Sequence, residues 1–131
     1  MQEPVWIDKP EVLAVHAMQL AQHGGLNGIR DESLLDSALA KPRNVFAYAE
    51  QPTLPLLAAS YAFGIARNHP FLDGNKRTAL VVCEGFLRLN GFNIESSKED
   101  KYFTFLHLAD GSVSEGQLHQ WLVQHLVPFE P

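Results

Sequence analysis

The chain has 131 residues, enough for one hydrophobic core, and its apolar content of 46% and charged content of 19% are those of a globular protein. Its net charge of −5 argues against a protein that works on nucleic acid, because binding to the phosphate backbone needs a basic surface. No N-terminal segment has the basic-then-apolar pattern of a signal peptide, and no apolar stretch approaches the roughly 20 residues that span a bilayer, so we expect a cytoplasmic protein without membrane contact.

Two helices are predicted in the first third of the chain. Asp8 can cap the first helix, and Gly24–Gly25 ends it, because glycine tolerates the left-handed conformation on which helices stop. Asp31 can cap the second helix, and Pro42 is expected to close it. Residues 42–52 are bounded by prolines and favour extended structure, so they are predicted as a surface loop or short hairpin.

The middle of the chain is predicted to form two buried helices joined by a tight turn. Thr53 can cap the third helix, whose residues 56–66 are apolar on nearly every side, and Pro70 stops it. The fourth helix begins near Asn75 and continues, again mostly apolar, to the cap at Asn90–Gly91. We therefore expect the third and fourth helices to form the axis of a helical bundle.

The last third of the chain is predicted to add two helices. Residues 96–99, Ser-Ser-Lys-Glu, suggest a capping box for a fifth helix, and Ser114 with Gln117 marks a sixth that runs through Leu126. The single cysteine, Cys83, lies in an apolar run and is expected to be a core residue rather than a reactive thiol. The predicted fold class is an all-α, single-domain bundle of about six helices.

The turn between the two central helices has the features of a phosphate site. Gly74 lets the backbone approach a ligand closely, and the first amide groups of the following helix are free to bind an anion at the positive end of the helix dipole. Lys76 and Arg77 oppose that dipole, at a cost of roughly 0.3–1 kcal/mol each, unless a bound anion compensates. This mismatch predicts phosphate binding.

Other side chains of the same turn suggest a reaction. Asp73 is a hard carboxylate suited to Mg²⁺ beside phosphates, and Asn75 can cap the helix or hold a phosphate oxygen. Histidine is a common general base in catalysis, and His69 can accept a proton from a hydroxyl nucleophile. Phe71 is expected to anchor the loop in the core, while Arg67 either reaches the phosphates or the target, or forms a surface ion pair. Each residue type also has an ordinary use, since Asp-Gly-Asn is a common turn.

Residues 69–77, His-Pro-Phe-Leu-Asp-Gly-Asn-Lys-Arg, resemble the signature of the Fic/Doc family, which reads His-x-Phe-x-Asp/Glu-Gly-Asn-x-x-Arg in its looser form. The helical order and the turn at residues 24–26, Gly-Gly-Leu, also resemble the short Doc (death-on-curing) toxins of toxin–antitoxin systems. The resemblance covers nearly the whole chain. It implies one Fic/Doc domain over residues 1–131, with a short extended flap at residues 42–52 that would dock the target chain by strand pairing.

The resemblance also assigns roles to the residues of the turn. His69 would be the general base that activates a target hydroxyl, and Asp73 would hold Mg²⁺. ATP would be the substrate. Its phosphates would be bound by four consecutive residues, Gly74, Asn75, Lys76 and Arg77.

Two reactions remain open within the family. The adenylyl-transferring branch has a second Gly where this chain has Lys76 and a second Arg where it has Leu80. Both changes resemble the Doc branch, in which the γ-phosphate is transferred to a translation elongation factor, so a toxin that acts as a protein kinase is the first hypothesis. Gly74 points the other way, because Doc itself has Ala there, and adenylyl (AMP) transfer is the alternative. A non-catalytic nucleotide-binding or interaction module is a third reading, although it would not need the base.

The same resemblance predicts an inhibitory partner. Some Fic proteins carry an inhibitory helix with the pattern Ser/Thr-x-x-x-Glu-Gly/Asn. Glu84-Gly85 and Glu115-Gly116 have Leu80 and Gly111 four positions earlier, so neither pair fits. We therefore expect a separate antitoxin, a small protein whose disordered tail folds onto the toxin.

Overall fold

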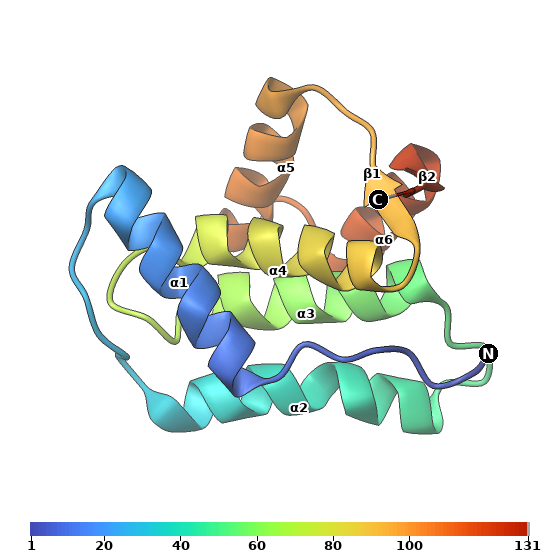
Figure 1. Cartoon of the computed structure of the whole chain (residues 1–131), viewed down its shortest axis with the longest axis horizontal. Helices are drawn as coiled ribbons and strands as arrows, with labels where there is room; N and C mark the ends of the chain where they lie inside the picture. The colour runs from blue at the N-terminus through green and yellow to red at the C-terminus, as the bar shows by residue number, and fades with distance from the viewer. Residues whose placement is uncertain (131) are drawn as a thin grey trace.

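The computed structural model describes residues 1–130 and contains six α-helices and one antiparallel pair of short strands (Figure 1). In chain order the elements are α1 (Lys9–His23), α2 (Glu32–Tyr48), α3 (Leu54–Asn68), α4 (Asn75–Leu89), β1 (Phe92–Ile94), α5 (Lys98–Asp110), α6 (Glu115–His125) and β2 (Leu126–Pro128). The all-α bundle of about six helices is confirmed. Residue 131, the last of the domain expected over residues 1–131, lies outside the described part. Within residues 1–130, no helix has both the length and the apolar character that crossing a membrane requires.

Helix α3 is the centre of the bundle. Ten of its residues, from Pro55 to Ala66, are buried, as expected for a helix that is apolar on nearly every side. It packs against α2, α4, α5 and α6, and Figure 1 shows it in green between α2 and α4. Gly64 permits the close approach of α2, since a Cβ there would lie 3.1 Å from the Cα of Ala38. The expected pairing of α3 with α4 is confirmed.

Helix α2 departs from the sequence prediction. It continues through Pro42 to Tyr48, so the loop or hairpin predicted for residues 42–52 is wrong for residues 42–48. A proline inside a helix costs about 3 kcal/mol or more. Here the proline is buried, and Val45 and Phe46 beyond it pack against the core, which offsets that cost. Only residues 49–53 separate α2 from α3.

The caps of the later helices follow the sequence closely, with two shifts. Ser114 and Gln117 form the predicted capping box. For α5 the cap is Ser97, whose Oγ accepts a hydrogen bond from the amide of Asp100 over 3.0 Å, one residue later than predicted. Helix α6 ends at His125, because the next residues form β2 and pair with β1, with Ile94 opposite Leu126.

Candidate active site

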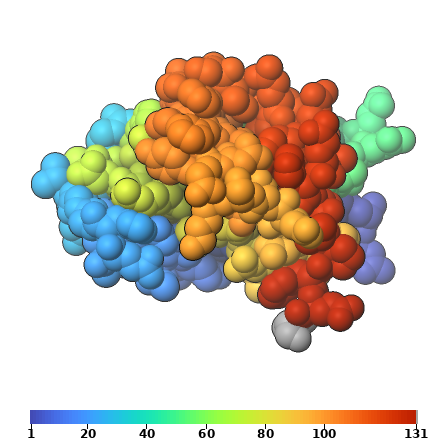
Figure 2. Space-filling model, turned by 90° about the horizontal axis from the view of Figure 1, so that it is seen from above, coloured from blue at the N-terminus to red at the C-terminus, as the bar shows by residue number. Residues whose placement is uncertain are grey.

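The turn at residues 69–74 lies at one end of the bundle, between α1 and α5 (Figure 2, where it is lime green). The connector between α1 and α2, residues 24–31, runs beside it. Ile29 and Phe71 form an antiparallel bridge, and the amide of Leu72 donates to the carbonyl oxygen of Gly28 over 3.0 Å. A segment about 40 residues away in sequence therefore holds the turn in place.

His69 ends α3 in a strained backbone conformation. Its φ of 48° and ψ of 57° lie in the left-handed region, and it is the only residue other than glycine with a positive φ among residues 1–130. Such outliers cost about 1–3 kcal/mol and gather at functional sites. Arg30 supports this end of the helix, because its guanidinium donates to the carbonyl oxygens of His69 and Asn68, each over 2.7 Å. The side chain of His69 is exposed.

The start of α4, residues 74–77, is a positively charged corner whose backbone amides lack hydrogen-bond acceptors within residues 1–130. Gly74 is the N-cap, with a φ of 80° and no side chain to cap the helix. Within the described residues, the amides of residues 75–77 have no hydrogen-bond acceptor. Lys76 and Arg77 are exposed and form no ion pair there. Free amides, the helix dipole and two cations together are the features of an anion site, so this corner is the candidate anion site.

Asn75 has a role in the structure other than the two expected for its side chain. Its Oδ1 accepts from the amide of Phe71 over 2.9 Å, and its Nδ2 donates to the carbonyl oxygen of Phe71 over 3.0 Å. The side chain therefore ties the turn together, and neither caps α4 nor reaches outward to a phosphate. Only its backbone amide faces the anion site. Phe71 itself is 1% exposed and lies in the core.

Asp73 is held on two sides. Its Oδ2 accepts from the amide of Leu26 over 2.7 Å, and its backbone carbonyl oxygen meets Nε2 of His16 at 2.8 Å. The residues described include no group of three or more His, Cys, Asp or Glu side chains that could hold a metal. A single carboxylate beside an anion site nevertheless fits Mg²⁺, which usually takes one or two carboxylates together with substrate phosphates and water.

Two adjoining cavities meet at the start of α4, and both include Asp73 to Lys76. One, of about 390 Å³, also includes His69 and, across from it, Asp110 at the end of α5. The other, of about 230 Å³, extends between α4 and α5 and has an apolar wall. That wall is formed by Leu80, Tyr102, Phe105 and Leu106. His69, the start of α4 and an apolar pocket are therefore contiguous.

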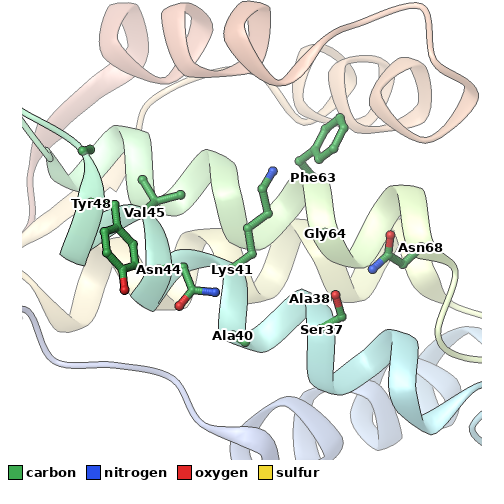
Figure 3. Close-up of a pocket in the computed structure, with 11 residues that line it drawn as sticks. Ser37, Ala38, Ala40, Lys41, Asn44, Val45, Tyr48, Phe63, Gly64 and Asn68 are labelled. Atoms are coloured by element: carbon green, nitrogen blue, oxygen red, sulfur yellow. The ribbon is translucent and has the colours of Figure 1, made fainter.

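A larger cavity, of about 710 Å³, is a groove between α2 and α3 (Figure 3). Lys41 reaches across it toward Phe63, with its ammonium 4.3 Å from the ring centroid, and pairs with Glu115 of α6. The groove includes no residue of the 69–77 turn. The candidate active site is therefore identified by the chemistry of the residues that line its cavities and not by cavity volume.

The family model described as Fic/DOC matches residues 6–87, a span that includes α1 to α3 and the whole 69–77 turn. This chain belongs to the Fic/Doc family. It is 36% identical over 93 residues to "Protein kinase doc" of Escherichia phage P1, which covers 71% of this chain and 74% of that protein. It is 37% identical over 90 residues to "Toxin Doc" of Mycolicibacterium smegmatis (strain ATCC 700084 / mc(2)155), which covers 68% of this chain and 67% of that protein.

Arg67 is not brought into the cavities at the Fic/Doc turn. Its guanidinium lies over the ring of Phe63, 5.3 Å from the centroid, and beside Gly111. It forms no ion pair within residues 1–130, so the surface ion pair is wrong, while contact with the target protein stays a prediction. Instead it packs the end of α3 against the turn between α5 and α6.

The segment beside His69 is not the one that the sequence assigned to docking. Residues 49–52 lie just before the start of α3, whereas His69 follows its end, about 22 Å away along a helix of 15 residues, and residues 42–48 belong to α2. The Fic/Doc turn instead pairs with residues 24–31, which carry the exposed side chains of Leu26 and Ile29. The sequence was interpreted here only as a turn, although two apolar residues, Leu26 between glycines and Ile29 directly after Gly28, were a signal for an exposed apolar segment.

Cys83 is buried, and burial raises the pKa of its thiol well above the usual range. This agrees with the core position predicted for it.

Proposed function

We propose that this Fic/Doc protein is a toxin that transfers the γ-phosphate of ATP to a hydroxyl group of a target protein. The observation that carries the proposal is that His69, Asp73 and the open N-terminus of α4 line one cavity. A module that only bound phosphate would not need an exposed histidine held in a strained conformation beside the anion site. We expect the protein to act in the cytoplasm.

In this proposal each residue of the site has a separate role in the in-line displacement at the γ-phosphorus of ATP. The imidazole of His69 takes the proton of the attacking hydroxyl as its oxygen forms the new bond to phosphorus, and ADP leaves with the electrons of the broken P–O bond. The amides at the start of α4, with Lys76 and Arg77, stabilise the charge on the phosphate oxygens. Mg²⁺ held by Asp73 would supply further charge neutralisation on the phosphates.

Two residues favour phosphate over AMP as the transferred group. Lys76 adds bulk and charge to the anion site, and Leu80 makes the neighbouring wall apolar where the adenylyl-transferring branch has an Arg. One relative is named a protein kinase. Gly74, which agrees with the adenylyl-transferring branch, is weaker evidence than Lys76 and Leu80. A Cβ at Gly74 would meet Leu20 at 3.5 Å and His16 at 3.6 Å, which are ordinary contacts. Alanine would therefore fit this space, at the cost of a strained φ.

Two label-transfer reactions test the proposal. The protein, ATP labelled at either the γ- or the α-phosphate, and a cell extract or a purified translation elongation factor are incubated with Mg²⁺. The proposal predicts label on the target from γ-labelled ATP alone. Label from α-labelled ATP would instead establish adenylyl transfer, and ATP binding without any label would establish a non-catalytic module.

The proposed docking segment for the target is residues 24–31 rather than residues 42–52. Leu26 and Ile29 are exposed there, and Leu72 adds a third apolar side chain beside His69. An extended segment that already pairs with the turn can pair with a target strand on its other side. By the family resemblance, the target is a translation elongation factor and the inhibitor is an antitoxin with a disordered tail, as suits a relative of a protein named "Toxin Doc".

A further inference from the structure

We propose that His16 of α1 is a positioning residue of the phosphate site, because it turns the Asp73–Gly74 peptide so that the amide of Gly74 faces the phosphate. The inference rests on the proposed function and adds to it a residue that lies outside the 69–77 turn. It also predicts a fourth amide donor in the anion site, besides those of residues 75–77.

His16 is a buried polar side chain with one clear partner. It is 4% exposed, and its Nε2 lies 2.8 Å from the carbonyl oxygen of Asp73. A carbonyl oxygen can only accept, so Nε2 carries the proton and donates. A buried donor of this kind is costly to leave unpaired, and so the bond holds the carbonyl of Asp73 toward α1.

The His16 ring is fixed in orientation by stacking, in addition to the hydrogen bond from its Nε2. It stacks on Phe71 with centroids 3.7 Å apart and planes only 9° from parallel. Phe71 is in turn tied through its backbone to Asn75. The orientation of the donor relative to the carbonyl oxygen of Asp73 is therefore fixed by packing as well as by the hydrogen bond.

The consequence for the anion site follows from peptide geometry. A trans peptide unit is planar, and its C=O and N–H bonds point in opposite directions. Because the carbonyl of Asp73 points into α1, the amide of Gly74 points away from α1, toward the cavity at the start of α4. This amide has no acceptor within residues 1–130, so it is available to a phosphate oxygen.

His16 also lies close to the backbone of Gly74. A Cβ there would lie 3.6 Å from Cδ2 of His16, so the histidine packs directly against the Gly74 backbone. The carboxylate of Asp73 is fixed separately by the amide of Leu26. Loss of the His16 donor would therefore free the peptide unit without removing the bond to the carboxylate.

Two substitutions separate the donor from the ring. His16→Gln places an amide nitrogen near the position of Nε2 and removes the stacking ring, whereas His16→Phe keeps the stack and removes the donor. Both are made in the full chain carrying His69→Ala, so that ATP binding is measured by calorimetry, with and without Mg²⁺, in the absence of turnover. Thermal unfolding of each variant is measured in parallel.

The proposal predicts that His16→Phe weakens ATP binding about tenfold, the effect of losing one well-placed hydrogen bond, while His16→Gln keeps most of the affinity. If the ring acts only as packing, the order is reversed, with His16→Phe binding ATP like the parent and His16→Gln losing both stability and affinity. That reversed order would overturn the proposal, as would losses of affinity that simply follow the unfolding temperature.

A measurement without any substitution at His16 covers the case in which a variant fails to fold. In ¹⁵N NMR spectra of the His69→Ala protein, the proton of His16 should be on Nε2, and the amide resonance of Gly74 should shift when ATP is added. A proton found only on Nδ1, or a Gly74 amide that does not respond while those of residues 75–77 do, would overturn the inference. Absence of ATP binding would overturn both this inference and the proposed function, whereas binding without label transfer would overturn only the transfer.

Discussion

The two ends of helix α3 are built differently. At its C-terminal end a strained turn is held by polar contacts, among them those of the distant Arg30 with the backbone of His69 and of the neighbouring Asn75 with that of Phe71. At its N-terminal end the helix begins at a Thr53 cap, after a short link from α2, and apolar packing does most of the work. Polar contacts specify direction and apolar packing does not, so the first end suits chemistry and the second suits stability. Substitutions at the two ends of α3 should therefore differ in their effects on phosphate transfer and on stability.

The largest effect is expected from His69→Ala. Loss of a general base typically lowers the rate about 10²–10⁴-fold, so label transfer to the target should fall by that factor. The unfolding temperature should change little, because the side chain belongs to an exposed residue. His69→Asn is a matched control, since asparagine tolerates the left-handed backbone but is a poor base. A His69→Asn protein as active as the parent would contradict the role of base.

The next effect separates the two candidate docking segments. Leu26→Asp, at the His69 end, should weaken transfer to the protein target about tenfold or more, because it places a charge where an apolar contact is proposed. Tyr48→Asp, at the other end of α3, should leave transfer unchanged. Both side chains are largely exposed, at 67% for Leu26 and 86% for Tyr48, so neither change should unfold the protein. The KM for the target measures the effect, and the opposite ranking would return docking to residues 42–52.

The same contrast explains how far the sequence could predict the molecule. The sequence predicts the helix ends on both sides of the 69–77 turn almost to the residue, because proline and glycine act as local stop and turn signals there, but it does not predict that Asn75 binds the backbone of Phe71 instead of capping α4. The course of residues 42–48 was not, because burial of Pro42 depends on what α2 packs against rather than on local preference.

Hydrogen bonds between residues far apart in the sequence could not be predicted either. His16 lies on the same face of α1 as the buried Val12, four residues earlier, which predicts burial for its ring but not its bond to Asp73. Arg30 looks like a solvated residue until the fold brings α3 beside it. Contacts between residues about 40 to 57 positions apart need the tertiary structure.

Arg30→Ala should lower transfer about tenfold, since it removes both hydrogen bonds that hold the backbone at the end of α3 and small displacements of a base are costly. Arg30→Lys is the matched control, because an ammonium keeps the charge but lacks the planar, two-pronged donor geometry. The kcat values of the two variants distinguish positioning of His69 from a purely electrostatic effect of Arg30. Equal losses support positioning of His69, and full rescue by lysine would show instead that Arg30 acts through its charge alone.

At the α2–α3 contact, a change should affect stability and not the reaction. Gly64→Ala brings a Cβ to 3.1 Å from the Cα of Ala38 and 3.3 Å from its carbonyl oxygen, so two helix backbones must separate. Overpacking typically costs about 1–3 kcal/mol, which exceeds the gain of about 1 kcal/mol in helix propensity from replacing glycine. Urea unfolding should show a net loss, while kcat of the folded protein stays at the parent value. A stabilised variant would mean that α2 can move away from α3 at little cost.

The smallest effect concerns pH and lies at the His69 end. Hydrogen bonds from Ser112 and then His107 lower the pKa of Asp110 from 3.8 to about 2. A lowered pKa in the folded state stabilises the protein above the ordinary value, and this contribution is lost as the pH falls from about 4 to about 2. The contribution is small, because the carboxylate is solvated. Asp110→Asn should therefore flatten the pH dependence of the free energy of unfolding only within that interval, as measured by urea titration at a series of pH values. An equal slope in the variant and the parent would show that the hydrogen bonds of Ser112 and His107 to Asp110 do not stabilise its carboxylate in solution.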